Sequence, residues 1–88
     1  MNKYELIEYK EMEKLGYLWD TDGNTYFKEM FFDYNELNKR RGLATIFFSD
    51  RKLQIYKGRL YNMCENGDDL VNNEINKLLK LNIIKEQA

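Results

Sequence analysis

Residues 26–48 read YFKEMFFDYNELNKRRGLATIFF, and this stretch decides how the rest of the chain is arranged. It holds two dense apolar runs, 26–32 and 43–48, which are rich in aromatic and β-branched side chains. Runs of this length and composition are typical of strands that pack one face on a core. We therefore expect both runs to be strands of an antiparallel sheet.

The polar segment between the two runs carries the signals of a short helix. Asp33 and Glu36 have the spacing of a capping box, in which two side chains satisfy backbone N–H groups at a helix start. Gly42 can adopt the left-handed conformation in which many helices end. The segment therefore predicts a helix over about 34–41. A helix of that length rises only about 12 Å, so the next strand should lie antiparallel to an earlier one or begin a separate ribbon.

The first apolar run is expected to pair with the segment that precedes it. Asp22-Gly23 is a strong signal for a type I′ turn, because both central residues of that turn have positive φ. This turn would place Trp19 opposite Tyr26 in a hairpin over about 17–32. Directly opposed residues share a face of a sheet, and we expect the face of Trp19 and Tyr26 to cover the core.

The second apolar run begins another predicted hairpin, over about 43–57, which turns through residues 49–52. Pairing Phe48 with Leu53 across this turn sorts the side chains into two faces. The face expected in the core is wholly apolar and consists of Ala44, Ile46, Phe48, Leu53 and Ile55. The opposite face holds Phe47 and Tyr56 among polar residues.

Two further helices are expected near the ends of the chain. The spacing of apolar residues predicts a helix over about 3–15, with Gly16 as its stop. The last helix starts near Asn66 or Asp68 and ends near Asn82, which can adopt the left-handed conformation. The apolar stripe of this last helix consists of Val71, Ile75, Leu78 and Leu79.

Residues 59–62 are expected to extend the preceding strand, and residues 83–85 to form a short extended tail. The expected fold is therefore α+β, with the order α-β-β-α-β-β-α. Its antiparallel sheet has about four strands, and the helices lie mainly on one face of the sheet. No linker, repeat or low-complexity segment divides residues 1–88, so we expect a single compact domain.

The composition favours a folded protein that does not enter membranes. Aromatic residues make up 15% of the chain, whereas disordered segments hold few aromatics. The apolar runs are too short to span a bilayer. Cys64 is the only cysteine, so no intrachain disulfide can form and we expect a cytoplasmic protein. Frequent Asn and Lys in a short chain that begins at Met are typical of small reading frames in phages and other mobile elements.

Side chains suited to catalysis are scarce. The chain has no His, the commonest general base and metal ligand, so Cys64 has no imidazole to activate it. Residues 20–24 resemble the start of a calcium loop, but Gly23 stands at the fourth position rather than the sixth. Asp33 with residues 50–52 has a loose likeness to the carboxylate and lysine set of metal-dependent nucleases, yet these residues already serve a cap and a turn. We expect no catalytic residue, no metal site and no cofactor, and hence no enzyme.

The net charge is −1, but the charges are segregated along the chain. Residues 1–38 come to −5, residues 39–59 to +6 and residues 60–88 to −2. Two consequences remain open. The opposed patches either produce local fields that steer a charged partner or face each other in the fold and cancel.

The basic segment and the outward aromatic residues define the expected partner-binding site. It consists of Arg40, Arg41, Phe47, Arg51, Lys52, Tyr56, Lys57 and Arg59. Basic residues interleaved with aromatic side chains suit the stacking of bases and the neutralisation of phosphates. Tyr, Trp and Arg also dominate the hot spots of protein–protein interfaces. The plainer alternative is that these arginines and lysines serve a helix end and an ordinary turn.

Two functions from different classes fit these features. We favour a non-enzymatic inhibitor that docks on a host defence or nucleic-acid-processing protein, such as a nuclease or its nucleic-acid complex, in the manner of anti-CRISPR proteins. The alternative is a small nucleic-acid-binding or regulatory protein that uses residues 39–59. In either case the protein is expected to act as a monomer or homodimer and away from membranes.

Overall fold

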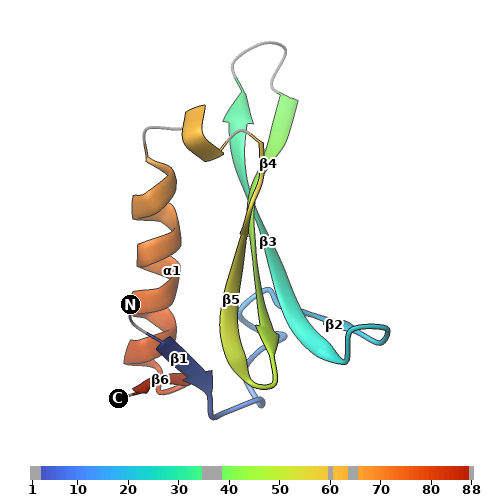
Figure 1. Ribbon diagram of the computed structural model, residues 1–88, viewed down its shortest axis with the longest axis vertical. Helices are drawn as coiled ribbons and strands as arrows, with labels where there is room; N and C mark the ends of the chain where they lie inside the picture. The colour runs from blue at the N-terminus through green and yellow to red at the C-terminus, as the bar shows by residue number, and fades with distance from the viewer. Residues whose placement is uncertain (1–2, 35–38, 60, 64–65, 88) are drawn as a thin grey trace.

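The computed structural model describes residues 3–34, 39–59, 61–63 and 66–87, with 32–34, 39–42 and 63 described by their backbone alone. In these residues six strands form one antiparallel sheet, and a single α-helix packs against it (Figure 1). The strands are β1 (Lys3–Leu6), β2 (Leu18–Asp20), β3 (Thr25–Tyr34), β4 (Lys39–Ser49), β5 (Lys52–Lys57) and β6 (Ile84–Gln87). A 3-10 helix, η1 (Tyr61–Met63), and the α-helix α1 (Gly67–Lys80) lie between β5 and β6.

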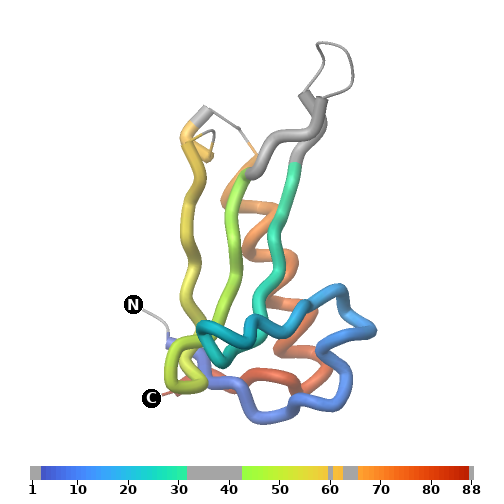
Figure 2. Tube along the Cα trace, turned by 90° about the vertical axis from the view of Figure 1, so that its right-hand side faces the viewer, coloured from blue at the N-terminus to red at the C-terminus, as the bar shows by residue number. Residues whose placement is uncertain are grey.

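The sheet is antiparallel as expected, but the predicted order α-β-β-α-β-β-α with about four strands is wrong. The strand order across the sheet is β2-β3-β4-β5-β1-β6, and the two ends of the described chain meet in β1 and β6. In the described part of the chain, two of the three predicted helices are replaced by strands and turns. The remaining helix, α1, lies against one face of the sheet (Figures 1 and 2).

The predicted helix over 34–41 is wrong, because β3 and β4 form a long central hairpin there. Tyr34 pairs with Lys39, and the pairing continues along both strands. The capping-box residue Glu36 lies outside the described residues. Strand pairing satisfies backbone groups along the whole hairpin, whereas a helix of about eight residues is marginal without packing. The strands therefore extend from both apolar runs into the polar residues between them, 33–34 and 39–42.

The predicted helix over 3–15 is also wrong. β1 pairs with β6, and Leu6, which lies opposite Ile84, is almost fully buried. Helical geometry survives only as a turn before Gly16, where the Leu15 N–H donates to a carbonyl one turn earlier at 3.1 Å. Gly16 then takes a φ of +92°, as its predicted role as a stop requires. The apolar spacing that suggests a helix here arises from a strand followed by a single turn.

The predicted register of the first hairpin is confirmed, but its turn is not of type I′. Trp19 lies opposite Tyr26, and the chain turns through residues 21–24. Of these four residues only Asn24 has a positive φ. The Asp20 carboxylate accepts a hydrogen bond from the backbone N–H two residues ahead, at 3.0 Å. An aspartate that bonds its own loop in this way favours a longer turn over the two-residue one.

The second hairpin has the predicted register, with Phe48 opposite Leu53. Its type I′ turn is made by Asp50 and Arg51, whose φ values are 50° and 68°. The predicted core face is confirmed: Ala44, Ile46 and Phe48 are buried, and Leu53 and Ile55 pack half-buried beside them. Pairing therefore holds two residues in a conformation that glycine and asparagine adopt more readily.

The hairpins contain two irregularities, a bulge in β4 and a bend after β5. The register of β3 and β4 shifts in mid-strand, so that Leu43 and Ala44 are both buried although they are adjacent. Gly58 donates its N–H to the Leu43 carbonyl at 2.8 Å, where β5 ends. The predicted extension of this strand over 59–62 is wrong, because the chain enters η1 instead.

α1 confirms the predicted last helix and its apolar stripe. Val71, Ile75 and Leu78 are buried, and Leu79 is half-buried. The helix is followed by Asn82 in the left-handed conformation, with a φ of 57°. The predicted extended tail is present and becomes β6. The core fills the space between α1 and the sheet and consists of Leu6, Met12, Tyr17, Leu43, Ala44, Ile46, Phe48, Tyr61, Val71, Ile75, Leu78, Ile83 and Ile84.

Candidate interaction surface

The sheet has one face that α1 leaves uncovered, and we call it the outer face. Figure 2 looks onto it, with α1 behind β3, β4 and β5. Pairing and alternation place these described side chains on it: Leu18, Phe27, Glu29, Phe31, Thr45, Phe47, Ser49, Lys52, Gln54 and Tyr56. Leu18 is 63% exposed and Tyr56 is 67% exposed. Aromatic and aliphatic side chains thus face solvent, with the exposed Glu29 among them, on a sheet whose other face is covered.

The outer face brings together three of the eight residues predicted to bind a partner. Phe47 pairs with Gln54, and Tyr56 pairs with Thr45, so the two rings are diagonal neighbours. Lys52 lies on the same face, two residues before Gln54 and next to the turn. The predicted diagonal arrangement of Phe47 and Tyr56 follows from the confirmed register.

The other predicted cations do not join this face. Lys57 lies opposite the buried Ala44, which places it on the helix side, and its ammonium is 4.8 Å from the centre of the Tyr61 ring. Arg59 follows the end of β5 and is exposed. The side chains of Arg40 and Arg41 lie outside the described residues. The continuous basic patch suggested by the sequence is therefore divided between at least two sides of the sheet.

Arg51 is held by contacts within the protein. Its Nε donates to the Leu6 carbonyl at 3.2 Å, and its guanidinium carbon lies 5.8 Å from the centre of the Tyr9 ring. The Leu6 N–H in turn donates to the Arg51 carbonyl at 2.7 Å. These bonds attach the β4–β5 turn to the end of β1. Arg51 therefore fixes the position of the β4–β5 turn as well as contributing a positive charge.

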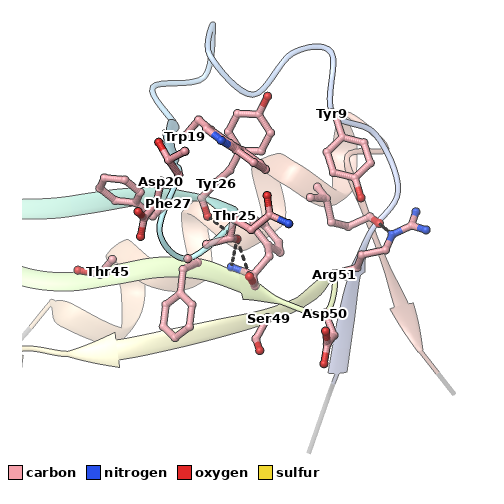
Figure 3. A pocket seen from close by; sticks show the side chains of 16 residues that line it. Tyr9, Trp19, Asp20, Thr25, Tyr26, Phe27, Thr45, Ser49, Asp50 and Arg51 are labelled. Carbon is pink, nitrogen blue, oxygen red and sulfur yellow. Dashed lines mark hydrogen bonds between the residues drawn. The ribbon is translucent and has the colours of Figure 1, made fainter.

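A broad hollow of about 1160 Å³ lies where the ends of the two hairpins meet (Figure 3). The β2–β3 loop forms one side of it and the β4–β5 turn forms another. Phe27 and Phe47 line the hollow and also belong to the outer face, so the two surfaces are continuous. Asp20 and Asp50 bring carboxylates to its lining.

Thr25 fixes the two sides of the hollow relative to each other. Its hydroxyl donates to the Phe48 carbonyl and accepts from the Phe48 N–H at 3.2 Å (Figure 3). A side chain thereby satisfies backbone groups of β4 at the point where β3 leaves it. The hollow is consequently preformed by the fold.

Three aromatic rings lie in series beside the hollow. The Trp19 indole packs edge-on against the Tyr26 ring, with centres 4.9 Å apart, and Tyr26 lies 6.4 Å from Tyr9. Trp19 is 47% exposed and Tyr9 is 44% exposed. Beyond Tyr9 stands the guanidinium of Arg51. Rings that pack against each other and remain half in water offer rigid apolar contact area for a partner.

Sequence reasoning missed this aromatic series. It assigned Trp19 to the core face and gave Tyr9 no role. The face is correct, but β2 is a three-residue edge strand close to a loop, and Trp19 remains half-exposed there. The sequence did hold a signal for this exposure. Trp19 comes close to the polar loop, and side chains near a hairpin tip extend past the core.

A buried carboxylate joins α1 to the helix side of the sheet. Glu74 is only 8% exposed and accepts a hydrogen bond from the Tyr17 hydroxyl at 2.9 Å. The ammonium groups of Lys28 and Lys77 lie 3.3 Å and 3.2 Å from its carboxylate oxygens. Lys28 also donates to the Leu15 carbonyl at 3.1 Å. The network therefore connects α1, β3 and the segment before β2.

The electrostatics of this network follow from burial and pairing. Burial alone would raise the pKa of Glu74, but the Tyr17 hydrogen bond and the Lys28 charge outweigh it, so the pKa lies below its ordinary value. Burial and the nearby Glu74 carboxylate raise the pKa of Tyr17 well above its ordinary value. Tyr17 therefore remains a neutral donor at pH 7. All these groups are partnered, which is typical of a structural network.

Comparisons with models of protein families, with curated proteins and with solved structures give no match for this chain. Within the described ranges no helix is long and apolar enough to cross a membrane. Among the same residues no three Cys, Asp or Glu side chains are grouped so as to hold a metal ion. The outer face and the hollow are therefore the features of the described residues that suggest a function.

Proposed function

We propose that this protein is a non-enzymatic binding protein that docks on a protein partner through the outer face and the adjoining hollow. The uncovered outer face carries the proposal, because it exposes Leu18 and Tyr56 beside the half-buried Phe27 and Phe47. Covering apolar surface releases free energy at about 25 cal/mol per Å². Contiguous exposed apolar patches mark interaction sites more often than isolated residues do.

The distribution of charge favours a protein partner over a nucleic acid. A groove that follows a phosphate backbone needs several cations on one side. Here Lys57 faces the helix side, and Arg51 is bonded to Leu6. Asp20 and Asp50 also place negative charge in the hollow. Nucleic-acid binding is therefore the second candidate, and among the described side chains its support is Phe47, Tyr56 and Lys52.

The narrower form of the proposal is inhibition of a host defence or nucleic-acid-processing protein, of the anti-CRISPR kind. Its support is the Asn-rich and Lys-rich composition and the aromatic docking face. Carboxylates beside exposed rings, as at Asp20 and Trp19, suit a partner with a basic nucleic-acid channel. Docking there would block the channel without any chemical step.

Tyr56→Ala tests the docking face. The ring is exposed, so its removal should leave the circular dichroism spectrum and the melting temperature unchanged. We expect the variant to bind a nuclease-based defence complex at least about tenfold more weakly than the unaltered protein, a loss of about 1.4 kcal/mol. Binding would be measured by titration of the purified complex, and inhibition by its nuclease activity.

Glu11→Ala is the matched control, because Glu11 is exposed and its ion pair with Lys14, at 3.7 Å, lies on the surface. It should bind and inhibit normally. Loss of inhibition in Glu11→Ala together with normal binding by Tyr56→Ala would move the working surface to the acidic half. Salt-dependent binding to oligonucleotides that Tyr56→Ala abolishes would favour the nucleic-acid candidate instead.

A further inference from the structure

β5 has an edge that the described strands cover only at one end. β4 pairs with β5 along its whole length, from Ser49 opposite Lys52 to Ala44 opposite Lys57. On the other side, β1 pairs with β5 at Lys52 alone. Figure 2 shows β5 at the margin of the sheet above this point. The edge is therefore open from Gln54 to Lys57 in the described part of the chain.

The tight turn determines which backbone groups point toward this edge. Because Ser49 and Lys52 flank a two-residue turn, the N–H and C=O of Lys52 face β4. Those of alternate residues face the other way, as the bond from β1 to the Arg51 carbonyl shows. Ile55 and Lys57 therefore direct their backbone groups away from β4, toward a side where no other described strand pairs with them.

The side chains at the open end of this edge are basic. Lys57 and Arg59 have no acidic residue between them in the sequence, and neither takes part in an ion pair within the described residues. Lys52 lies at the covered end, opposite Glu5 of β1. Lysines on an edge strand discourage pairing with neutral or basic strands. A second copy of this chain would bring an equally basic β5. An acidic strand would instead gain from opposite charges across the pair.

We propose that the open edge of β5 takes up an extended, acidic segment of a partner protein as an added strand. This inference rests on the proposed docking function and names the partner's chemistry. The open stretch of four residues is about 13 Å long, enough for a short peptide strand. On the helix side, an apolar side chain would cover the half-buried Ile55, and a carboxylate two residues away would lie near Lys57. Backbone bonds would give affinity, and the charges would give selectivity.

The test uses a blocked hexapeptide with glutamate, valine and glutamate at its first, third and fifth positions and threonine at the others, so that valine and glutamate share one face. We expect this peptide to bind. Its binding should slow the exchange of the Ile55 and Lys57 amide protons with solvent, as measured by nuclear magnetic resonance. The same peptide with N-methylated backbone nitrogens keeps the side chains but loses donors, so it should bind at least about tenfold more weakly. A peptide with lysine in place of glutamate should also bind at least about tenfold more weakly.

A charge reversal in the protein is the counterpart of the change from glutamate to lysine in the peptide. Lys57→Glu should weaken binding of the glutamate peptide and strengthen binding of the lysine peptide. Lys14→Glu should leave peptide binding unchanged, because Lys14 is exposed and precedes β2, which β3 and β4 separate from β5. Equal binding of the N-methylated peptide would overturn the added strand, and so would loss of peptide binding in Lys14→Glu. Neither result would affect docking through the outer face, which Tyr56→Ala tests with the whole partner.

Self-association is the remaining outcome. If the Ile55 and Lys57 amides become protected as the protein concentration rises, without any peptide, the occupant is a second copy and the inference is wrong. Sedimentation at the same concentrations would show the dimer directly. We expect a monomer at every concentration and no change in these two amides.

Discussion

Glu74 is a charged residue in the middle of an apolar helix stripe. It lies three residues after Val71 and four before Leu78, both of which are buried. A carboxylate at this position would be costly without partners, but Tyr17, Lys28 and Lys77 supply them. Its helical phase was a signal in the sequence. The partners were not, because they lie far away along the chain.

Glu74 makes the stability of the protein depend on pH in the acid range. Its pKa is lower in the folded protein than its ordinary value of 4.5, so its stabilising effect is present above pH 4.5 and is lost as the pH falls through the folded pKa. We expect Glu74→Gln to flatten the decline of the unfolding free energy between about pH 5 and pH 3. Urea titrations at several pH values would measure it. An equally steep decline in Glu74→Gln would show that other carboxylates control the acid transition.

The turn at Asp50 and Arg51 stores local strain, because both residues have positive φ. Arg51→Gly and Arg51→Ala remove the same side-chain contacts with Leu6 and Tyr9. Only glycine adopts the left-handed conformation without cost. We expect Arg51→Gly to be more stable than Arg51→Ala by about 1 kcal/mol in chemical unfolding. Equal stability of the two variants would mean that the turn is not of type I′.

Among the elements, the β4–β5 hairpin shows the clearest division between a buried and an outer face. Ile46 is fully buried, so Ile46→Ala should cost about 2–5 kcal/mol of unfolding free energy. Ile55→Ala should cost less, because Ile55 is only half-buried. Thr45→Ala and Gln54→Ala on the outer face should change stability by less than about 1 kcal/mol. The reverse ranking in thermal unfolding would show that the faces are exchanged.

The β3–β4 hairpin shows how element-level signals mislead. The capping-box spacing of Asp33 and Glu36 favours a helix, and it is real as a local pattern. However, Asp33 lies opposite Arg40 in the sheet. A local cap contributes about 1 kcal/mol, whereas extending two apolar strands adds a backbone ladder along the whole hairpin. The ladder therefore stabilises the segment more than the cap does, and the segment forms strands.

At the scale of the whole molecule, the fold depends on pairing between the first and last strands. β6 pairs with β1 from Leu6 opposite Ile84 to Lys3 opposite Gln87, and Ile84 is almost fully buried. β1 has only one pair with β5, so β6 is its main support. Removal of residues 84–88 should therefore lower the unfolding free energy by about 3 kcal/mol or more.

Thermal unfolding followed by circular dichroism would measure this loss. Lys85→Ala and Glu86→Ala are the controls, because both side chains are exposed and should change stability by less than about 0.5 kcal/mol. A truncated protein that melts like the full chain would show that β1 is held by the Arg51 contacts alone.

The sequence by itself determined the registers of both hairpins, the core face of β4 and β5, and α1 with its end at Asn82. These features depend on side-chain periodicity and on residues within one turn or hairpin of each other. The diagonal placement of Phe47 and Tyr56 follows from the same local register. The eight-residue site was predicted only in part. Side chains alternate along β5, so Lys57 lies on the helix side and not beside Tyr56, and Arg51 bonds to the distant strand β1.

Only the tertiary structure decided the strands at residues 3–6 and 39–41, the Glu74 network and the hollow beside Trp19. Each depends on partners distant in sequence. β1 pairs with β6, and Glu74 contacts Tyr17 and Lys28. The hollow needs both the β2–β3 loop and the β4–β5 turn. Propensity and capping contribute about 1 kcal/mol or less per residue, so burial and strand pairing override them wherever the two disagree. Periodicity in a single segment cannot reveal which distant segment will cover it.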